Sequence, residues 1–257
     1  MAPITIGVLA LQGGVGEHIH LLKQASAHIL AGGDHDGVEF AFIEVRYPEQ
    51  LVKSDALIIP GGESTTMAIV ARRLGLLDPL REFVKVNCKP VWGTCAGLVM
   101  LAEEASATKK GGQELVGGLD VKVLRNRYGT QIQSFVADLE LPFLGDAEKP
   151  FRGVFIRAPV VEEIKTAAKT EQLEVNGYSE TVNGTGKSEE AVEVMGVFKQ
   201  AGAGEAGSSV EDIVAVRQRN VFGTSFHPEL TNDIRIHVWW LKRVLEALRH
   251  GDLVVAN

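Results

Sequence analysis

The chain has 257 residues, 45% of them hydrophobic and 23% charged, which is typical of a globular protein with a core and favours one large α/β domain. Its formal net charge of −7 at pH 7 argues against a nucleic-acid partner, because proteins that bind nucleic acids present a basic face. No apolar run approaches the roughly 18 residues of a membrane span, and the N-terminal residues lack the features of a secretory signal, so we expect no membrane partner.

In the first half of the chain, short apolar runs alternate with helical stretches. Ile19, Leu22, Ala25 and Ile29, for example, give residues 17–30 the spacing of a helix. In chain order the pattern predicts strands over 4–11, 40–45, 56–59 and 90–92, and helices over 17–30, 65–74, 80–86 and 96–102. Strand followed by helix, with short Gly-rich turns, predicts an α/β fold: an open mixed, mostly parallel sheet flanked by helices, in a flavodoxin-like three-layer arrangement.

The second half is richer in strands and has no internal repeat. Its pattern predicts strands over 119–123, 132–137, 153–156, 192–198, 213–218 and 221–226, and a final helix over 234–248. Three polar or Gly-rich segments, at 31–37, 141–150 and 167–209, are interpreted as surface insertions, and part of the last is expected to be mobile. We therefore expect one domain over 1–250 with these insertions, followed by a short tail at 251–257.

The two cysteines, Cys88 and Cys95, have different settings. So few cysteines exclude a disulfide scaffold and favour a reducing compartment, so we expect a soluble, cytoplasmic protein. Cys88 follows a predicted helix and is interpreted as an ordinary thiol. Cys95 lies where a predicted buried strand turns directly into a helix, and it is the candidate nucleophile.

Residues 93–97 (Gly-Thr-Cys-Ala-Gly) have the pattern of a nucleophile elbow with Cys in place of Ser. Small residues on both sides are needed, because flanking Cβ atoms would clash with the backbone in this strained turn. The turn exposes the sulfur at a helix N-terminus, where the unpaired N–H groups and the helix dipole favour the thiolate. The N–H of Ala96 can also bind the oxyanion of a tetrahedral intermediate.

A base for this nucleophile is offered by His227 and Glu229, which close the last predicted strand. Alternating side chains of an extended segment point to the same side at every second residue, and Pro228 favours extended geometry at His227. The carboxylate can then orient the imidazole as the third member of a triad. The other histidines have weaker claims: His18, His20 and His28 lie on a predicted helix, His35 on a polar loop, and His237 and His250 on or near the last helix.

The third motif is the turn Pro60-Gly61-Gly62, which ends a strand and precedes Glu63, Ser64 and two threonines. The Ser and Thr residues are expected to cap the following helix, and the N–H of Gly62 can complete the oxyanion hole with Ala96. The spacing and lysine of a Walker phosphate loop are missing. The histidines, cysteines and carboxylates show no metal-ligand spacing, so neither a metal nor a cofactor is expected.

Together these motifs resemble those of the class I (triad) glutamine amidotransferases. Longer strings at 9–13, 60–67, 92–98, 153–159 and 225–231 are similar to the glutaminase subunits of pyridoxal 5'-phosphate synthase, the two-component route to vitamin B6. Gly-Gly-Glu-Ser-Thr-Thr at 61–66 and Phe-Ile-Arg-Ala-Pro at 155–159 separate this branch from the imidazole glycerol phosphate and GMP-forming relatives.

The resemblance implies a role for each matching residue. Cys95 attacks the side-chain amide of L-glutamine, His227 transfers the proton and Glu229 orients it. The implied glutamine-binding residues are Gly62, Glu63, Ser64, Arg125, Ile156 and Arg157. The implied products are glutamate, released from a γ-glutamyl thioester, and ammonia, which passes to a barrel-shaped synthase subunit. Gln12 resembles a position that couples docking of that partner to formation of the oxyanion hole.

Two other functions remain open from the sequence. A cysteine peptidase or related α/β thiol hydrolase uses the same elbow, and a non-catalytic binding or chaperone-type module can keep the fold without turnover. The presence of Cys95, His227 and Glu229 together argues against the second alternative.

Overall fold

The computed structural model describes residues 2–33, 37–106, 112–125, 127, 134–145, 149–165, 191–200 and 210–250. Most of the predicted insertion at 167–209, parts of those at 31–37 and 141–150, and the tail at 251–257 lie outside these ranges. Their role as insertions and the single domain over 1–250 stay predictions.

In the described part of the chain, ten strands form one sheet, with nine in the order β2-β1-β3-β4-β12-β11-β9-β6-β5 and β10 paired to β11. The strands β1 to β4 and β12 run parallel, whereas β9, β10 and β11 pair antiparallel with their neighbours. A separate antiparallel pair consists of β7 (Ser134–Leu139) and β8 (Phe151–Ile156). The strands of the large sheet are β1 (Ile4–Leu9), β2 (Phe40–Val45), β3 (Ala56–Ile59), β4 (Val91–Thr94), β5 (Ala102–Ser106), β6 (Leu119–Leu124), β9 (Val160–Ile164), β10 (Glu193–Gln200), β11 (Val210–Gln218) and β12 (Val221–Thr224).

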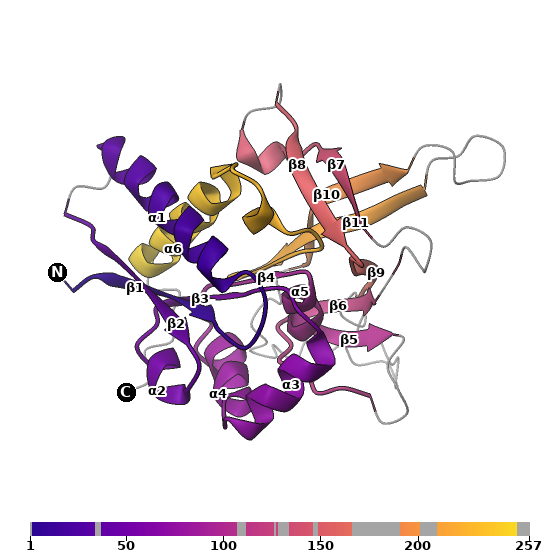
Figure 1. Cartoon of the computed structure of the whole chain (residues 1–257), viewed down its shortest axis with the longest axis horizontal. Coiled ribbons are helices and arrows are strands. Elements are labelled where there is room, and N and C mark those ends of the chain that lie inside the picture. Colours follow the sequence, from indigo (N-terminus) through magenta and orange to yellow (C-terminus); the bar gives the residue numbers. More distant parts are fainter. Residues whose placement is uncertain are drawn as a thin grey trace, which may run out of the picture.

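Helices cover both faces of the parallel part of this sheet (Figure 1). On one face lie α1 (Val15–Ala31) and α6 (Arg235–His250), which pack against each other. On the other lie α3 (Ser64–Arg73), α4 (Leu77–Arg81) and α5 (Ala96–Leu101), with the short α2 (Pro48–Leu51) beside β2. The predicted α/β fold, a mixed, mostly parallel sheet between helical layers, is confirmed.

The strand register builds a separate core on each face of the sheet. Val91 pairs with Leu57 and Val221, and these side chains join the core under α3, α4 and α5. The next residue, Trp92, belongs to the core under α1 and α6, together with the strand residues beside it. Side chains alternate along a strand, so one short, wholly buried β4 supplies both cores.

Several predicted boundaries were wrong. The helix predicted over 80–86 is α4 followed by a π-helix, Glu82–Val86, and it begins earlier because Pro79 lies in the first turn, where a proline is tolerated. The strands β5 and β9 were missed: β5 follows α5 without a turn residue between them, and its sequence, Ala-Glu-Glu-Ala-Ser, lacks apolar alternation. The strand predicted over 221–226 ends at Thr224.

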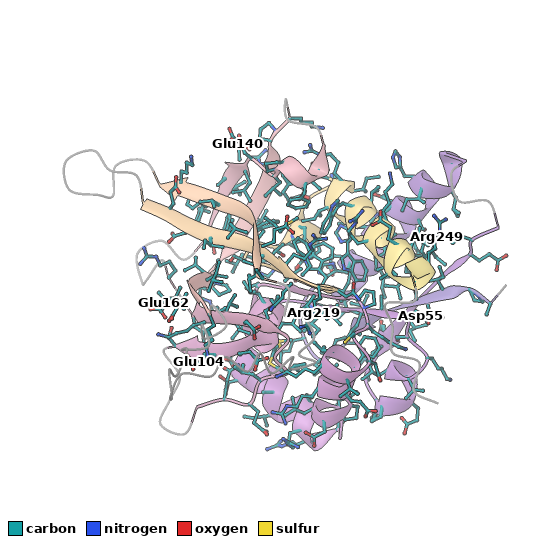
Figure 2. The ribbon with its side chains drawn as sticks, turned by 180° about the vertical axis from the view of Figure 1, so that it is seen from behind. Asp55, Glu104, Glu140, Glu162, Arg219 and Arg249 are labelled. Carbon is teal, nitrogen blue, oxygen red and sulfur yellow. The ribbon has the colours of Figure 1, made fainter. Side chains whose placement is uncertain are left out.

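The edge of the sheet formed by β5, β6 and β9 is covered by charged pairs. Glu104 from β5 and Glu162 from β9 lie on the same side of the molecule (Figure 2). Lys165 lies 2.8 Å from the Glu104 carboxylate, and Lys122 lies 3.0 Å from that of Glu162. Charged side chains at an edge discourage pairing with another chain.

No helix within the described ranges is long and apolar enough to cross a membrane.

Candidate active site

The candidate site lies where three neighbouring parallel strands, β3, β4 and β12, reach their carboxyl ends. The chain leaves β3 through Pro60 and Gly61, leaves β4 at Cys95, and reaches His227 two residues beyond Ser225 after β12. A crevice outside the carboxyl ends of parallel strands is where open α/β sheets bind ligands. Neighbouring strands thus bring together residues that are far apart in the sequence.

Cys95 has the strained backbone that the elbow pattern predicts. Its φ of 50° and ψ of −106° are unusual for a residue with a side chain, and it is the N-cap of α5. A Cβ on Gly97 would lie 1.9 Å from the carbonyl oxygen of Ile59, and a Cβ on Gly93 would lie 2.4 Å from the carbonyl carbon of Gly97. The glycines are required because β3, β4 and α5 approach one another at backbone contact.

His227 and Glu229 form a close pair beside this thiol. His227 Nδ1 lies 2.7 Å from Glu229 Oε1, and His227 and Cys95 line the same cavity. A Cβ on Gly61 would lie 2.4 Å from Cε1 of His227, so a glycine leaves room for the ring. Glu229 is only 5% exposed, and Cys95 only 6%. The sequence prediction of a nucleophile, a base and an orienting carboxylate is compatible with this arrangement.

The predicted reason for this pairing was partly wrong. The segment beyond His227 is a 3₁₀ turn, Pro228–Leu230, rather than an extended strand. The turn, rather than strand alternation, brings Glu229 under the ring of His227. The two-residue spacing therefore gave the right neighbours through a different local geometry.

The electrostatics of the pair favour its charged form. Burial by itself lowers the pKa of His227, but hydrogen bonds and charges from Cys95 and Glu229 outweigh it and raise the pKa to about 10. Burial acts to raise the pKa of Glu229, yet His227 and a second histidine, His18, lower it below its usual value.

Glu63 and Arg125 form a polar part of the wall of the same cavity. Arg125 Nη2 lies 2.9 Å from Glu63 Oε1, and the Glu63 side chain accepts hydrogen bonds from the N–H groups of Thr65 and Thr66. Glu63 is thus the N-cap of α3, rather than the Ser and Thr residues expected. Burial acts to raise the pKa of Glu63, but its bonds to Thr66 and Thr65 lower it to about 2.

Gln12 lies behind the Gly-Gly turn. Its Oε1 accepts a hydrogen bond of 2.8 Å from the N–H of Glu63, and a Cβ on Gly62 would lie 2.8 Å from that same oxygen. Gly62 has a φ of +148°, which favours glycine. Gln12 therefore holds the peptide that follows Gly62, next to the peptide whose N–H is a predicted oxyanion donor.

These residues surround a cavity of about 480 Å³, a size suited to a small ligand. All of the sequence-predicted site residues line it except Gln12, which contacts it through Glu63: the lining includes Gly62, Glu63, Ser64, Cys95, Ala96, Arg125, Ile156, Arg157, His227 and Glu229. The carbonyl oxygen of Ile156 lies 3.9 Å from Cys95 Sγ. Within the described ranges, no group of three or more His, Cys, Asp or Glu side chains is arranged to hold a metal ion.

The sequence interpretation missed other residues at the site. The cavity is also lined by Gly13, Gly14, Glu17, Val99, Pro159 and Leu230. Behind Glu229, two fully buried histidines lie in contact: His18 on α1 and His237 on α6. The spacing of His18 from Leu21, Leu22, Ala25 and Ile29 puts it on the buried face of α1, a signal that could have found it.

Fold and site together define an α/β protein with a cysteine elbow, a His–Glu pair and a cavity for a small polar ligand. The family model described as "SNO glutamine amidotransferase family" matches residues 8–246. The chain belongs to this family.

Similar proteins agree with this assignment. The chain is 44% identical to a "Probable pyridoxal 5'-phosphate synthase subunit PDX2" from Arabidopsis thaliana, over 95% of this chain and 87% of that protein. It is 40% identical to a "Pyridoxal 5'-phosphate synthase subunit PdxT" from Pyrococcus furiosus, over 94% of this chain and 100% of that protein. A solved structure described as a glutamine amidotransferase superposes with a TM-score of 0.65 at 36% identity, covering 93% and 98% of the two chains. The family resemblance predicted from the motifs is confirmed.

Proposed function

We propose that this chain is the glutaminase subunit of a pyridoxal 5'-phosphate synthase, which hydrolyses L-glutamine to glutamate and ammonia. The observation that carries the proposal is that Cys95 and the bonded pair of His227 and Glu229 line one cavity with the ion pair of Glu63 and Arg125. The printed names of relatives at 44% and 40% identity support the particular branch.

The proposed reaction has two halves. In the first, the Cys95 thiolate attacks the side-chain carbonyl carbon of glutamine, and the His227 imidazolium gives its proton to the departing ammonia, which leaves a γ-glutamyl thioester. In the second, neutral His227 takes a proton from water, the resulting hydroxide attacks the thioester, and glutamate leaves with the thiolate restored. Glu229 holds the Nδ1 side of His227, so that the other nitrogen faces the sulfur.

The wall of the cavity supplies groups for the rest of the substrate. Arg125 suits the α-carboxylate as a charge-assisted donor, and Glu63 suits the α-ammonium. These two side chains are ion-paired in the structure, so glutamine replaces one internal pair with two pairs of its own. Ser64, Arg157 and the backbone of Ile156 complete the proposed binding set.

The oxyanion of each tetrahedral intermediate requires two N–H donors, for which we propose Ala96 and Gly62. Ala96 begins α5, so its N–H has no acceptor within the helix. Gln12 holds the peptide after Gly62 by its bond to Glu63, which supports a role in adjusting this donor when a partner docks. The proposed partner is the barrel-shaped synthase subunit, which receives the ammonia.

We also propose a cytoplasmic location, in keeping with the two free thiols, Cys88 and Cys95.

Ammonia release from glutamine, measured with and without purified synthase subunit, tests the function. We expect release that increases when the synthase subunit is added. Cys95→Ala should release none while still binding the synthase, because the substitution removes only the sulfur. Ammonia release by this variant would refute the nucleophile.

Two further assays separate the alternatives. A cysteine peptidase would cleave members of a peptide panel and leave free glutamine intact. A non-catalytic module would not be labelled at Cys95 by a glutamine-mimic diazo-ketone, even with the synthase present. Either result would overturn the proposal.

A further inference from the structure

Two histidines with no role in the proposed reaction lie directly behind the triad. His18 comes from α1 and His237 from α6, and both are fully buried. His18 Nδ1 lies 3.1 Å from His237 Nε2, and His18 Nε2 lies 3.4 Å from Glu229 Oε2. Glu229 therefore lies between two imidazoles, with His227 on Oε1 and His18 on Oε2.

The carboxylate oxygen on the His18 side needs a donor. Glu229 Oε2 is buried and has no hydrogen bond of good geometry within the described residues, and its distance from His18 Nε2 is long for such a bond. A buried carboxylate oxygen left without a donor is costly, and distances in ligand-free sites often shorten on substrate binding. His18 Nε2 is thus placed to supply the missing N–H.

The acceptor at Glu229 fixes the protons along the chain of imidazoles. A carboxylate only accepts, and the Thr94 hydroxyl, 3.5 Å from His18 Nε2, can accept as well as donate, so a proton on Nε2 of neutral His18 suits both neighbours. His18 Nδ1 is then an acceptor, and the hydrogen between the two rings must come from Nε2 of His237. This leaves Nδ1 of His237 unprotonated, in agreement with its having no hydrogen-bond partner in the part of the chain that the structure describes.

Both histidines are held neutral, as this chain of donors requires. Burial lowers the pKa of His18 to about 3, against an opposing effect of Glu229, with smaller lowering effects of His237 and His227. Burial lowers the pKa of His237 to about 3. The rings also pack on Trp92, whose centroid lies 5.8 Å from that of His18 and 4.9 Å from that of His237, and this contact holds their orientation.

We infer that His18 is a positioning residue of the triad: its Nε2–H holds Oε2 of Glu229, so that Oε1 stays directed at His227, and His237 fixes the tautomer of His18. The inference rests on the proposed function, because it assigns a role in the same reaction. It makes the packing of α1 against α6 part of the catalytic apparatus. A donor to the far oxygen keeps the carboxylate from rotating away from His227 or from taking up a proton.

Three substitutions at His18 separate positioning from packing. The amide nitrogen of His18→Gln reaches about as far as Nε2, whereas that of His18→Asn reaches only as far as Nδ1, and His18→Leu has no donor. With the synthase subunit present, we expect kcat for glutamine hydrolysis to fall about 10- to 100-fold in the Asn and Leu variants, with KM little changed. His18→Gln should recover most of that loss. His20→Asn, an exposed histidine two residues along the same helix, is the matched control and should retain wild-type kcat.

A second measurement does not depend on glutamine turnover. The rate of alkylation of Cys95 by iodoacetamide is followed against pH, with the modified peptide identified by mass so that Cys88 is not counted. In the Asn and Leu variants, Glu229 takes up a proton more readily, so the acidic limb of the profile should move to higher pH. In His18→Gln it should stay near that of the wild type. If His18→Asn does not fold, His237→Gln, which keeps a donor toward His18, is compared in the same way with His237→Phe, which has none.

The outcomes distinguish a positioning role of His18 from a packing role, and this inference from the proposed function. Equal losses in the Gln, Asn and Leu variants that follow their melting temperatures, with unshifted alkylation profiles, would reduce His18 to a packing residue and overturn the inference. A wild-type complex that releases no ammonia would instead overturn the proposed function, and the alkylation profiles would still report whether His18 supports the His227–Glu229 pair.

Discussion

The proposed reaction at Cys95 depends on a proton held nearby. His227 keeps its proton well above neutral pH, because Cys95 and Glu229 together outweigh the effect of burial. Glu229 in turn stays ionised because imidazoles lie on both of its oxygens. The proposed thiolate, imidazolium and carboxylate therefore support one another as a unit, and removal of one member changes the other two.

The three members should contribute unequally to turnover. In glutamine hydrolysis by the complex, we expect Cys95→Ala and His227→Asn each to lower kcat by at least about 10⁴-fold, because each removes a bond-making or proton-carrying group. Glu229→Ala should retain a kcat roughly 100-fold higher than these two variants, because the base remains and only its orientation is lost. Steady-state ammonia release measures all three. A Glu229→Ala variant as inactive as Cys95→Ala would show that the carboxylate does more than orient the base.

The buried histidines should make the fold sensitive to acid. His18 and His237 have a pKa lowered from 6.5 to about 3, so the stability that they contribute is present above pH 6.5 and is lost as the pH falls toward 3. Each adds up to about 1.4 kcal/mol per pH unit to the fall in the free energy of unfolding. His227 has the opposite sign: its contribution is present below pH 6.5 and is lost as the pH rises through about 10.

Urea unfolding at a series of pH values measures this effect. In His237→Phe, the free energy of unfolding should fall less steeply with acidification than in the wild type. The difference in slope should approach that of one bound proton, about 1.4 kcal/mol per pH unit. An unchanged slope would mean that His237 is not the group that takes up a proton on unfolding.

At the scale of elements, two strand-to-helix turns carry the site, and backbone contact fixes both. The turn from β4 into α5 brings Gly97 against the carbonyl of Ile59, at the end of β3. The turn from β3 into α3 brings Gly61 against the His227 ring. The glycines therefore set the distance between the sheet and the helix, rather than merely the direction of the chain.

One methyl group should disturb this contact measurably. Gly97→Ala introduces a Cβ that would lie 1.9 Å from a backbone oxygen, so β3 and α5 must move apart. We expect a destabilisation of about 3 kcal/mol and a loss of activity. Gly16→Ala, in the first turn of α1 with no atom within 4 Å of the new Cβ, is the control and should stabilise by about 0.5 kcal/mol. Denaturant unfolding compares the two, and similar midpoints for both would contradict the account.

The sequence was most informative where a motif carries its own geometry. The elbow, the Gly-Gly turn and the parallel sheet were predictable because glycine spacing and apolar runs report local backbone requirements. The cap of α3 and the turn at Glu229 were wrong in detail, because several polar residues compete for the same N–H groups there. His18 and His237 could not be paired from the sequence, since 219 residues separate them and only the packing of α1 on α6 brings them together.

At the scale of the whole molecule, the two cores share the central strands, which argues for one cooperative unit. Trp92 and Trp240 lie in the core under α1 and α6, and Trp239 packs against it. Tryptophan fluorescence therefore reports on that face of the sheet, whereas far-UV circular dichroism reports on both. We expect the two signals to give the same urea midpoint. A fluorescence transition that precedes the other would show that this helical layer can separate from the rest.

Glu63 caps the N-terminus of α3 and also lines the cavity. In a mutational library aimed at new amide substrates, substitutions that remove this cap would therefore destabilise α3 by about 1 kcal/mol, whatever their effect on binding. The side chain of Ile156 carries no such constraint, because it is 37% exposed and only its backbone carbonyl approaches Cys95. Divergence toward other substrates should begin at Ile156, with Glu63 left unaltered.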